Sequence, residues 1–400
     1  MYKFPVKRMY WLDSVAQDPR AMARARRLSN ALGVASSEMM SRGEFRERAA
    51  EWARARSDSY PRRTGSFDYS GGWTVVLGTY AEGGDVGEDL PLVGYRSAAE
   101  QAKMGGICRS GLELHCAYGC YHRCAYCFCD PHFLIAVDLE RLAEALPGYF
   151  ARYPSQLLFK FDNLTDTIAL EPELGASDLL VRSFAESDRY LLLYTKSDNV
   201  EHLLDIPHKG RTIVNWSLSP LTQSRVIEVN APEMPARIGA MRRCQKAGYT
   251  IRARFSPIVP LVGWRDEMTG LVDLLFSSVR PDVISIDVVG WCQARALAEA
   301  MDISLLESPF REHVGRLARE GHEGTDKYLF PHEMRLAILE HAVREIRRRA
   351  GSVPVALCNE TAGMWEALGH ELSPMTPANY ACTCGPDCVP DHPLLARGNT

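Results

Sequence analysis

The chain has 400 residues, of which 46% are hydrophobic and 24% charged, and its formal net charge is −4. This composition is typical of a soluble globular protein, and the length predicts one large α/β domain with extensions or two domains. The weak negative charge excludes a general attraction to polyanions, so nucleic-acid binding would require a local basic patch.

The sequence contains no run of about 18 apolar residues, so we predict no membrane span. Its first residues, MYKFPVKRMYWLDSV, lack the apolar core of a signal peptide. We therefore expect a cytoplasmic protein without a membrane partner. In a reducing cytosol the twelve cysteines are expected to be free thiols or metal ligands rather than disulfides.

The first part of the chain differs in pattern from the rest. Residues 14–56 carry helical periodicity with many Arg and Ala residues, and SDSYPRRTGS then interrupts it. A single strand, WTVVLGTY, is predicted in the Gly-rich stretch that follows. We interpret residues 1–107 as an N-terminal helical extension.

Short apolar runs alternate with helical stretches from about Leu112 onward. Six strands are predicted: LELHC, LLFKF, YLLLYTK, TIVNWSLS, TIRARFSPI and DVISIDVVG. A helical pattern after each strand predicts parallel βα units. We predict an α/β fold with a partial (β/α)6 TIM-type barrel over residues 108–300, followed by a C-terminal helical region with a Cys-rich tail over residues 301–400. In such barrels the chemistry lies on the loops after the strands.

The stretch CYHRCAYCFC follows LELHC and so falls on such a loop. Cys120, Cys124 and Cys127 read C-x3-C-x2-C. Three thiolates on a four-iron cube leave one iron open for a substrate or cofactor. A zinc site would need Cys116 or Cys129 as a fourth ligand. The spacing favours a [4Fe-4S] cluster over zinc.

In this strand–loop context CYHRCAYC resembles the signature of the radical SAM (S-adenosylmethionine) superfamily. The resemblance implies that the open iron chelates the amino and carboxylate groups of SAM. It also implies that one electron from the cluster splits SAM into methionine and a 5′-deoxyadenosyl radical, and that Tyr126 lies near the adenine. An electron donor such as flavodoxin or ferredoxin is then expected.

Further segments resemble the spore photoproduct lyase branch of that superfamily over about residues 112–292; they are FDNLTDTIALEPEL, YTKSDNVEHLLD, NWSLSP, MPARIGAMRRCQKAGY and FSPIVPLVGW. The resemblance implies that Lys196 and Ser217 hold the SAM carboxylate. It also implies that Thr165 and Asp166, with the neighbouring Asn163, contribute to the cofactor site. A Lys ammonium and hydroxyl groups at strand ends suit a carboxylate.

Two positions differ from that branch. The branch places a hydrogen-donating cysteine just before the second-strand Thr-Asp, where this chain has Asn163 and Leu164. The tyrosine after the third cluster cysteine is replaced by Phe128. Both changes remove groups that return a hydrogen atom at the end of repair, so they favour altered substrate chemistry over repair of thymine dimers.

Two arginines in IRARF, Arg252 and Arg254, have their side chains on the same side of a predicted strand. Either they face the barrel mouth, where Arg254 would bind a phosphate or carboxylate of the cofactor or substrate, or they pair with acids. The two interpretations carry equal weight.

The tail offers a second group of thiols. Cys382, Cys384 and Cys388 form C-x-C-x3-C, and Cys358 lies upstream in ALCNE. These four residues are predicted to bind a second iron–sulfur cluster. The alternatives are that a tail thiol is the catalytic hydrogen donor, or that the thiols bind zinc or are simply exposed.

Together these features predict a radical SAM enzyme, lyase-like, that abstracts hydrogen from a nucleoside, nucleotide or sugar-like small molecule to make, break or rearrange a C–C bond. Its predicted catalytic residues are Tyr126, Cys382, Cys384 and Cys388. DNA ranks below a small molecule as partner. The alternatives are a DNA-lesion lyase with its donor thiol in the tail, and a zinc-binding protein without enzymatic activity.

Overall fold

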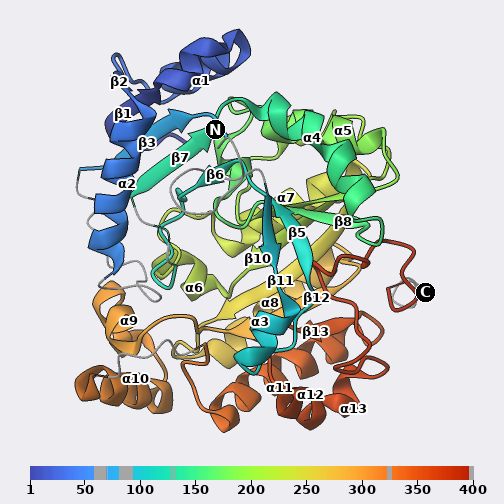
Figure 1. The fold of residues 1–400 in the computed structure, drawn as a ribbon. Coiled ribbons are helices and arrows are strands. Elements are labelled where there is room, and N and C mark those ends of the chain that lie inside the picture. The colour runs from blue at the N-terminus through green and yellow to red at the C-terminus, as the bar shows by residue number, and fades with distance from the viewer. Residues whose placement is uncertain are drawn as a thin grey trace.

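The computed structural model describes residues 1–57, 69, 71–80, 93–127, 129, 131–321 and 327–395. In these residues the fold is mixed α/β, built on one eight-stranded and one five-stranded sheet (Figure 1). Phe128, one of the two positions that differ from the spore photoproduct lyase branch, lies outside the described residues.

The larger sheet has the strand order β13-β12-β11-β10-β9-β8-β5-β4. Seven of its strands pair in parallel: β5 (Gly111–Leu114), β8 (Leu158–Phe161), β9 (Tyr190–Thr195), β10 (Thr212–Leu218), β11 (Thr250–Ile258), β12 (Ile284–Val288) and β13 (Val355–Leu357). β4 (Val93–Arg96) adds an antiparallel edge to β5. The first six of the seven parallel strands confirm the six predicted ones. The spatial order follows the chain order, as βα units require.

Helices connect these strands and cover the sheet. They are α4 (Leu139–Arg152), α5 (Ala176–Ala185), α6 (Leu221–Val226), α7 (Met234–Lys246), α8 (Trp264–Ser278), α9 (Ala294–Ala300), α10 (Ser308–Glu320) and α11 (His332–Arg349). In α8 the buried residues include Trp264, Met268, Leu271 and Leu275, which recur at helical spacing on one face. Burial of each such side chain contributes about 1.5–3 kcal/mol, so this face holds α8 against the sheet.

Several charged side chains on the strands of the larger sheet are buried. Glu113 on β5 and Lys160 on β8 pair at 3.2 Å, and Arg96 on β4 lies 2.9 Å from Glu113. Arg252 on β11 is fully buried and pairs with Asp282 at 3.0 Å. Buried charges are costly unless they are paired, so the sheet encloses a polar interior rather than a purely apolar core.

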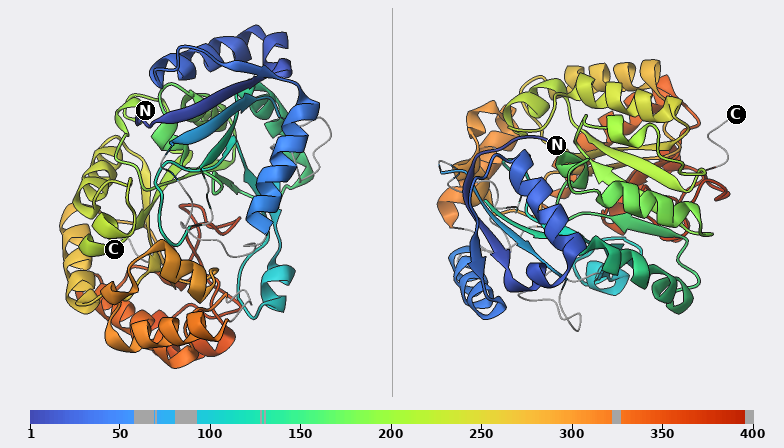
Figure 2. Two further views of the ribbon diagram at one scale, coloured as in Figure 1. Left: turned by 90° about the vertical axis from the view of Figure 1, so that its left-hand side faces the viewer. Right: turned by 90° about the horizontal axis from the view of Figure 1, so that it is seen from above.

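The first hundred residues contain the strand predicted in WTVVLGTY and further strands that were not predicted, which corrects the expectation of a helical extension. β1 (Val6–Leu12), β2 (Glu38–Met40) and β3 (Trp73–Gly78) build the smaller sheet with β6 (Ala117–Tyr118) and β7 (His132–Ala136), in the order β2-β1-β3-β7-β6. Among the described residues of this region, the α-helices are α1 (Pro19–Ala31), α2 (Arg42–Ser57) and α3 (Ala98–Lys103), and Asp13–Gln17 forms a 3-10 helix. Figure 2 shows these N-terminal elements, in blue, packed beside the larger sheet. β3 confirms the strand predicted in WTVVLGTY, whereas β1 and β2 were not predicted, because they pair with partners far along the chain.

The chain ends in α12 (Ala362–Ala367), α13 (Gly369–Leu372) and an irregular tail. The tail runs along the start of β8, where Leu157 N and Leu158 N both donate to Pro386 O at 2.8 Å. None of the described helices is long and apolar enough to cross a bilayer.

Candidate active site

The cysteine loop leaves β6 and returns into β7, so it connects two neighbouring antiparallel strands of the smaller sheet. Gly119 precedes it with φ 103°, and a Cβ there would lie 2.2 Å from His132 O. Only glycine permits this close approach. Inside the loop Cys127 N donates to Cys124 O at 2.9 Å, which closes the turn that carries the second and third signature thiols.

This loop is fixed to the segment between β10 and α7. Ala125 N donates to Ile227 O at 2.9 Å, and Asn230 N donates to His122 O at 3.0 Å. Cys124 and Glu228 form an isolated antiparallel bridge. Backbone hydrogen bonds therefore hold the loop in place independently of any cofactor.

The signature thiols lie near one another and near a cation. Cys120 interacts electrostatically with Cys124 and Cys127. Burial raises the pKa of the Cys124 thiol to about 12, although the Lys196 ammonium nearby acts in the opposite direction. Thiols bind iron as thiolates, so cluster binding must release these protons.

The alternative fourth zinc ligands have other partners. The Cys116 thiol lies 3.5 Å from Thr167 Oγ1, and the Cys129 thiol donates to Leu164 O at 3.8 Å. Among the described residues, the signature thiols do not form a set of three ligand atoms within 4.8 Å of one another. The C-x3-C-x2-C spacing of the signature thiols, with Cys116 and Cys129 engaged elsewhere, fits a multi-iron cluster with one open iron.

Asp166, predicted in the cofactor site, is the centre of a buried hydrogen-bond network at the ends of β8 and β9. Its carboxylate lies 2.7 Å from His122 Nε2 and accepts hydrogen bonds from Thr195 Oγ1 at 2.9 Å and from Lys196 N at 2.7 Å. Burial acts to raise the pKa of Asp166, but His122 and these hydrogen bonds outweigh it and lower the pKa. Asp166 thus ties the cysteine loop, through His122, to the strand end that carries Lys196.

Glu228 is the centre of a second buried network. Arg237 Nη2 donates to its carboxylate at 2.5 Å, Ser219 Oγ donates at 2.6 Å, and the Tyr126 hydroxyl donates to it as well. Burial acts to raise the pKa of Glu228, but Arg237 and then Lys196 outweigh it and lower the pKa to about 2. Glu228 therefore stays ionised beside the signature loop.

The other predicted cofactor residues lie at the same edge of the sheet. Thr165 Oγ1 is buried without a hydrogen-bond partner. Lys196 Nζ lies 5.8 Å from the centre of the Tyr126 ring, and Ser217 is buried near the end of β10. The Asn163 side chain is exposed. An unpaired hydroxyl together with an ammonium group fits the amino and carboxylate groups of SAM.

The two arginines of β11 have different surroundings. Arg252 pairs with Asp282, in agreement with the acid-pairing interpretation, and also donates to the tail carbonyl Cys388 O at 2.7 Å. Arg254 Nη2 lies 3.1 Å from Cys358 Sγ and 3.5 Å from Asp287 Oδ2. Buried Nε of Arg254 and Oδ1 of Asp287 have no hydrogen-bond partner. A role of Arg254 toward the cofactor stays a prediction.

The tail thiols lie at the start of the strands, the edge opposite the cysteine loop. Thr383 N donates to Ser285 Oγ, near the beginning of β12, at 3.1 Å. Thr383 stands between Cys382 and Cys384 in the sequence, and Cys388 follows a few residues later. Cys358 directly follows β13, and its thiol interacts electrostatically with that of Cys384. The second iron–sulfur cluster and the catalytic role of these thiols stay predictions.

Sequence reasoning missed three residues that organise the site: Glu228, Arg237 and His122. Glu228 and Arg237 are fully buried, and His122 is 2% exposed. His122 lies within the quoted cysteine motif, so its position was a usable signal. Glu228 and Arg237 stand in ordinary-looking segments, and only the fold brings their charges together.

Comparisons with known proteins agree with this geometry. A family model described as spore photoproduct lyase matches residues 108–352. The spore photoproduct lyase of Bacillus subtilis (strain 168) is 23% identical over 241 residues, which cover 57% of this chain and 69% of that protein. The enzyme of the same name from Geobacillus sp. (strain Y412MC61) is 26% identical over 156 residues, or 37% of this chain and 46% of that protein.

Solved structures share the fold. A spore photoproduct lyase mutant superposes with a TM-score of 0.61 at 15% identity, covering 89% of this chain and 99% of that one. Another mutant, described with AdoMet and dinucleoside spore photoproduct bound, gives a TM-score of 0.57 at 16% identity, covering 90% and 100%.

The cysteine loop and the matches together define a radical SAM enzyme, lyase-like, which uses a [4Fe-4S] cluster and S-adenosylmethionine. The chain belongs to the spore photoproduct lyase family, whose model covers more than half of it.

Proposed function

We propose that this chain is a radical SAM lyase that acts on the spore photoproduct in DNA. The observation that carries the proposal is the family match over residues 108–352, which contains the cysteine loop and both buried networks around it. The comparisons support this alternative better than the nucleoside or sugar-like small molecule that the sequence favoured. Reductive cleavage of bound SAM supplies a 5′-deoxyadenosyl radical that abstracts hydrogen from an unactivated carbon.

The residues of this chain hold and orient the reactants. Cys120, Cys124 and Cys127 would ligate the cluster, with the loop fixed by His122–Asp166 and by Cys124–Glu228. Lys196, Ser217 and Thr165 would bind the amino-acid end of SAM, and Tyr126, oriented by Glu228, would lie beside the adenine. A flavodoxin or ferredoxin would supply the electron.

A thiol near the site supports the repair chemistry. The family's hydrogen-donating cysteine is missing at Asn163 and Leu164, but the Cys129 thiol donates to Leu164 O at 3.8 Å. Cys129 therefore brings a thiol from the cysteine loop to the strand end where the family has one. In this proposal its S–H bond breaks as a C–H bond forms on the product radical. The external donor then restores the thiol with one electron and one proton.

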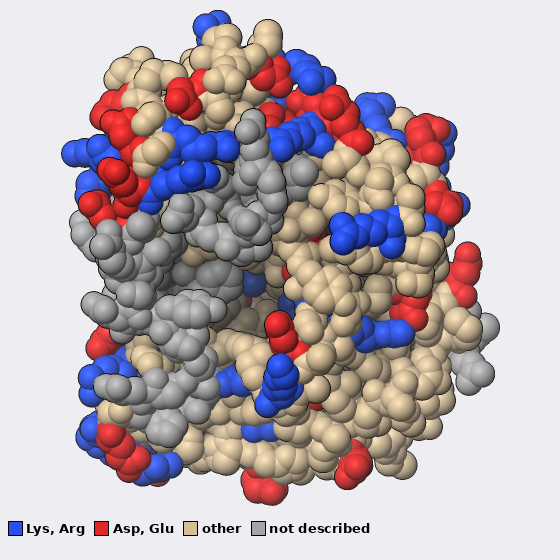
Figure 3. Space-filling view, viewed as in Figure 1, with Lys and Arg blue, Asp and Glu red and all other residues tan. Residues whose placement is uncertain are grey.

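A basic hollow on the smaller sheet supports binding of a phosphate backbone. It has a volume of about 280 Å³ and is lined by Lys7, Arg8, Tyr10, Arg48, Thr74 and His132. Thr74 pairs with Arg8 and with His132 in the strand register, so these side chains belong to neighbouring strands. Figure 3 shows Lys and Arg side chains gathered over β1 and α2. This is the local basic patch that an acidic protein needs to hold DNA.

The barrel architecture and the division of the chain into three regions are also part of this proposal. We infer a partial (β/α)6 barrel, supported by the parallel order of β5 and β8 to β12. Residues 1–107, 108–300 and 301–400 would be the N-terminal extension, the barrel and the C-terminal region; the start of the family match at residue 108 supports the first boundary.

The test is turnover of dinucleoside spore photoproduct by anaerobically reconstituted protein with SAM and dithionite. The proposal expects loss of the photoproduct together with formation of 5′-deoxyadenosine. Formation of 5′-deoxyadenosine only with free nucleosides or sugars would support the small-molecule interpretation instead.

A further inference from the structure

Trp291 follows β12 at the strand ends of the larger sheet, the same edge that carries Lys196 and the cysteine loop. Its backbone has φ 60°, a left-handed conformation that is rare for a bulky residue. Its side chain is 42% exposed, and it is the only exposed tryptophan among the side chains that the structure describes. A large aromatic group is therefore presented to solvent at the edge of the candidate active site, on a strained backbone.

The chain around Trp291 holds this strained conformation in place. Val289 is 1% exposed and Cys292 is fully buried, so both flanks are fixed in the core. A Cβ on Gly290 would lie 2.1 Å from Lys327 O, and Trp291 N donates to the same carbonyl at 3.3 Å. Backbone strain persists only where the surrounding structure determines it, and strained residues cluster at functional sites. The exposure of Trp291 is thus built into the fold.

A cation lies beside the indole ring. Lys327 Nζ is 5.5 Å from the centre of the Trp291 ring and donates to Asn359 Oδ1 at 3.1 Å. The Asn359 amide in turn donates to Gln101 Oε1 at 2.7 Å, which fixes the position of the ammonium group. An aromatic surface next to positive charge is the combination with which proteins bind unpaired nucleotides, because the base stacks on the ring and the charge attracts the phosphate.

The position of Trp291 relative to the basic hollow suits a nucleic-acid strand. α9 begins shortly after Trp291, and both Figure 1 and Figure 2 place α9 on the same side of the molecule as α2. Arg48 of α2 lines the basic hollow. A DNA strand held by its phosphates at the hollow can therefore continue along this side toward Trp291.

We propose that Trp291 stacks on a nucleobase that flanks the photoproduct in the DNA strand. Trp291 stands at the rim of the strand ends rather than among the buried residues around the cysteine loop, so a neighbouring base fits it better than the lesion itself. The inference rests on the proposed DNA substrate. It gives Trp291 a role in binding and in the preference for DNA over a dinucleoside, which carries no flanking base.

The test is the affinity of anaerobically reconstituted protein for a duplex oligonucleotide with one spore photoproduct. W291G removes the ring, and glycine adopts φ 60° without strain, so this variant should unfold at no lower temperature than the wild type. We expect its Kd for the duplex to rise about 5- to 100-fold. W291F keeps an aromatic face and should restore much of the affinity. Y95A alters an exposed aromatic residue on β4 and should bind as the wild type does.

The dinucleoside substrate provides the second measurement. In W291G, kcat/KM for the duplex should fall relative to kcat/KM for dinucleoside spore photoproduct, because only the duplex offers a base to the ring. Wild-type affinity of W291G for the duplex would overturn the proposal. An equal loss in Y95A, or an equal loss of turnover with the dinucleoside, would overturn it as well.

Two further outcomes keep the inference separate from the proposed function. Repair of the dinucleoside with unchanged duplex binding in W291G would reject the role of Trp291 and leave the proposed function standing. Absence of repair together with weakened duplex binding in W291G would do the reverse. Should W291G not fold, duplex binding must quench tryptophan fluorescence in the wild type more than in W291F, and equal quenching overturns the proposal.

Discussion

Cys124 and Glu228 lie opposite each other in an isolated antiparallel bridge, and the Glu228 carboxylate pairs with Arg237 at 2.5 Å. One short contact thus links a cluster cysteine to a fully buried ion pair. Breaking a buried pair leaves an uncompensated charge, which costs much more than losing a surface pair. The position of the cluster loop therefore depends on this ion pair.

Replacement of Glu228 tests that dependence. E228Q leaves Arg237 buried without its counter-ion, so we expect the free energy of unfolding at pH 7 to fall by about 3–5 kcal/mol. Chemical denaturation measures this value. E340Q, which breaks an exposed pair with Arg344 on α11, should change it by no more than about 0.5 kcal/mol. Equal effects of the two variants would contradict the account.

The same pair predicts a pH dependence. The pKa of Glu228 is lowered from 4.5 in the reference state to about 2 in the folded protein, against the effect of burial, by Arg237 and Lys196. Its ionised form therefore stabilises the fold fully above about pH 4.5, and this contribution is lost as the pH falls toward 2. Unfolding experiments across this range should show a smaller pH slope in E228Q than in the wild type. An unchanged slope would exclude Glu228 as its source.

Asp166 connects the cysteine loop to β9. D166N removes the charge that holds His122 Nε2 and weakens the hydrogen bonds from Thr195 and Lys196. We expect reconstituted D166N to hold clearly fewer than about four irons per chain and to lose about 1–3 kcal/mol of stability. Iron and sulfide assays measure the first effect. D178N, which alters an exposed pair with Arg182 on α5, should keep full iron, and a similar loss there would argue against a specific role of Asp166.

Cys129 is expected to return hydrogen to the product. In C129A, 5′-deoxyadenosine should still form, but the repaired product should fall at least about tenfold and by-products should accumulate. In D₂O the wild type should incorporate deuterium from the exchangeable thiol, and C129A should not. C384S provides the comparison for a donor thiol in the tail. Loss of deuterium incorporation in C384S but not in C129A would show that the hydrogen-donating thiol lies in the tail.

The basic hollow on β1 and α2 is expected to bind the DNA backbone. K7Q/R8Q/R48Q should weaken binding to duplex oligonucleotides and reduce the slope of log affinity against log salt by up to about 2.7, at about 0.9 per lost contact. Turnover of the dinucleoside substrate should not change. R316Q/R344Q/R348Q removes three exposed charges from α10 and α11 and serves as the control. Equal loss of DNA binding in both triple variants would show a general charge effect instead of a binding face.

The sequence allowed prediction of the parts of this fold that local patterns encode. The six parallel strands from LELHC to DVISIDVVG were recognisable because each is a short apolar run followed by a helical period. In the smaller sheet only β3 was recognisable, as WTVVLGTY; β1 was not, because it mixes exposed Lys7 and Arg8 with buried residues and pairs with the distant strands β2 and β3.

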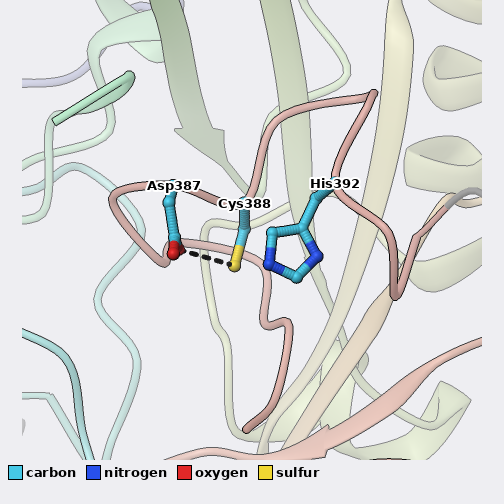
Figure 4. Close-up of side chains that lie close together, drawn as sticks. All are labelled: Asp387, Cys388 and His392. Atoms are coloured by element: carbon cyan, nitrogen blue, oxygen red, sulfur yellow. Dashed lines mark hydrogen bonds between the residues drawn. The ribbon is translucent and has the colours of Figure 1, made fainter. Parts of the chain in front are cut away.

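In the candidate site, too, local sequence patterns predicted some features, whereas others depend on the fold. The cysteine spacing alone indicated the cluster loop, whereas the pairing of Glu228 with Arg237 depends on how the segment after β10 folds back on α7. The sequence also identified the tail thiols, but not His392, which lies near the Cys388 thiol (Figure 4) only because the chain turns after Cys388.

The most direct test of the central claim is turnover of spore photoproduct in a duplex oligonucleotide by anaerobically reconstituted protein, with SAM and dithionite. C120A/C124A/C127A serves as the inactive control. The account predicts loss of the photoproduct, restoration of the thymines and formation of 5′-deoxyadenosine in the wild type alone. Formation of 5′-deoxyadenosine by the wild type with the photoproduct left intact would contradict it.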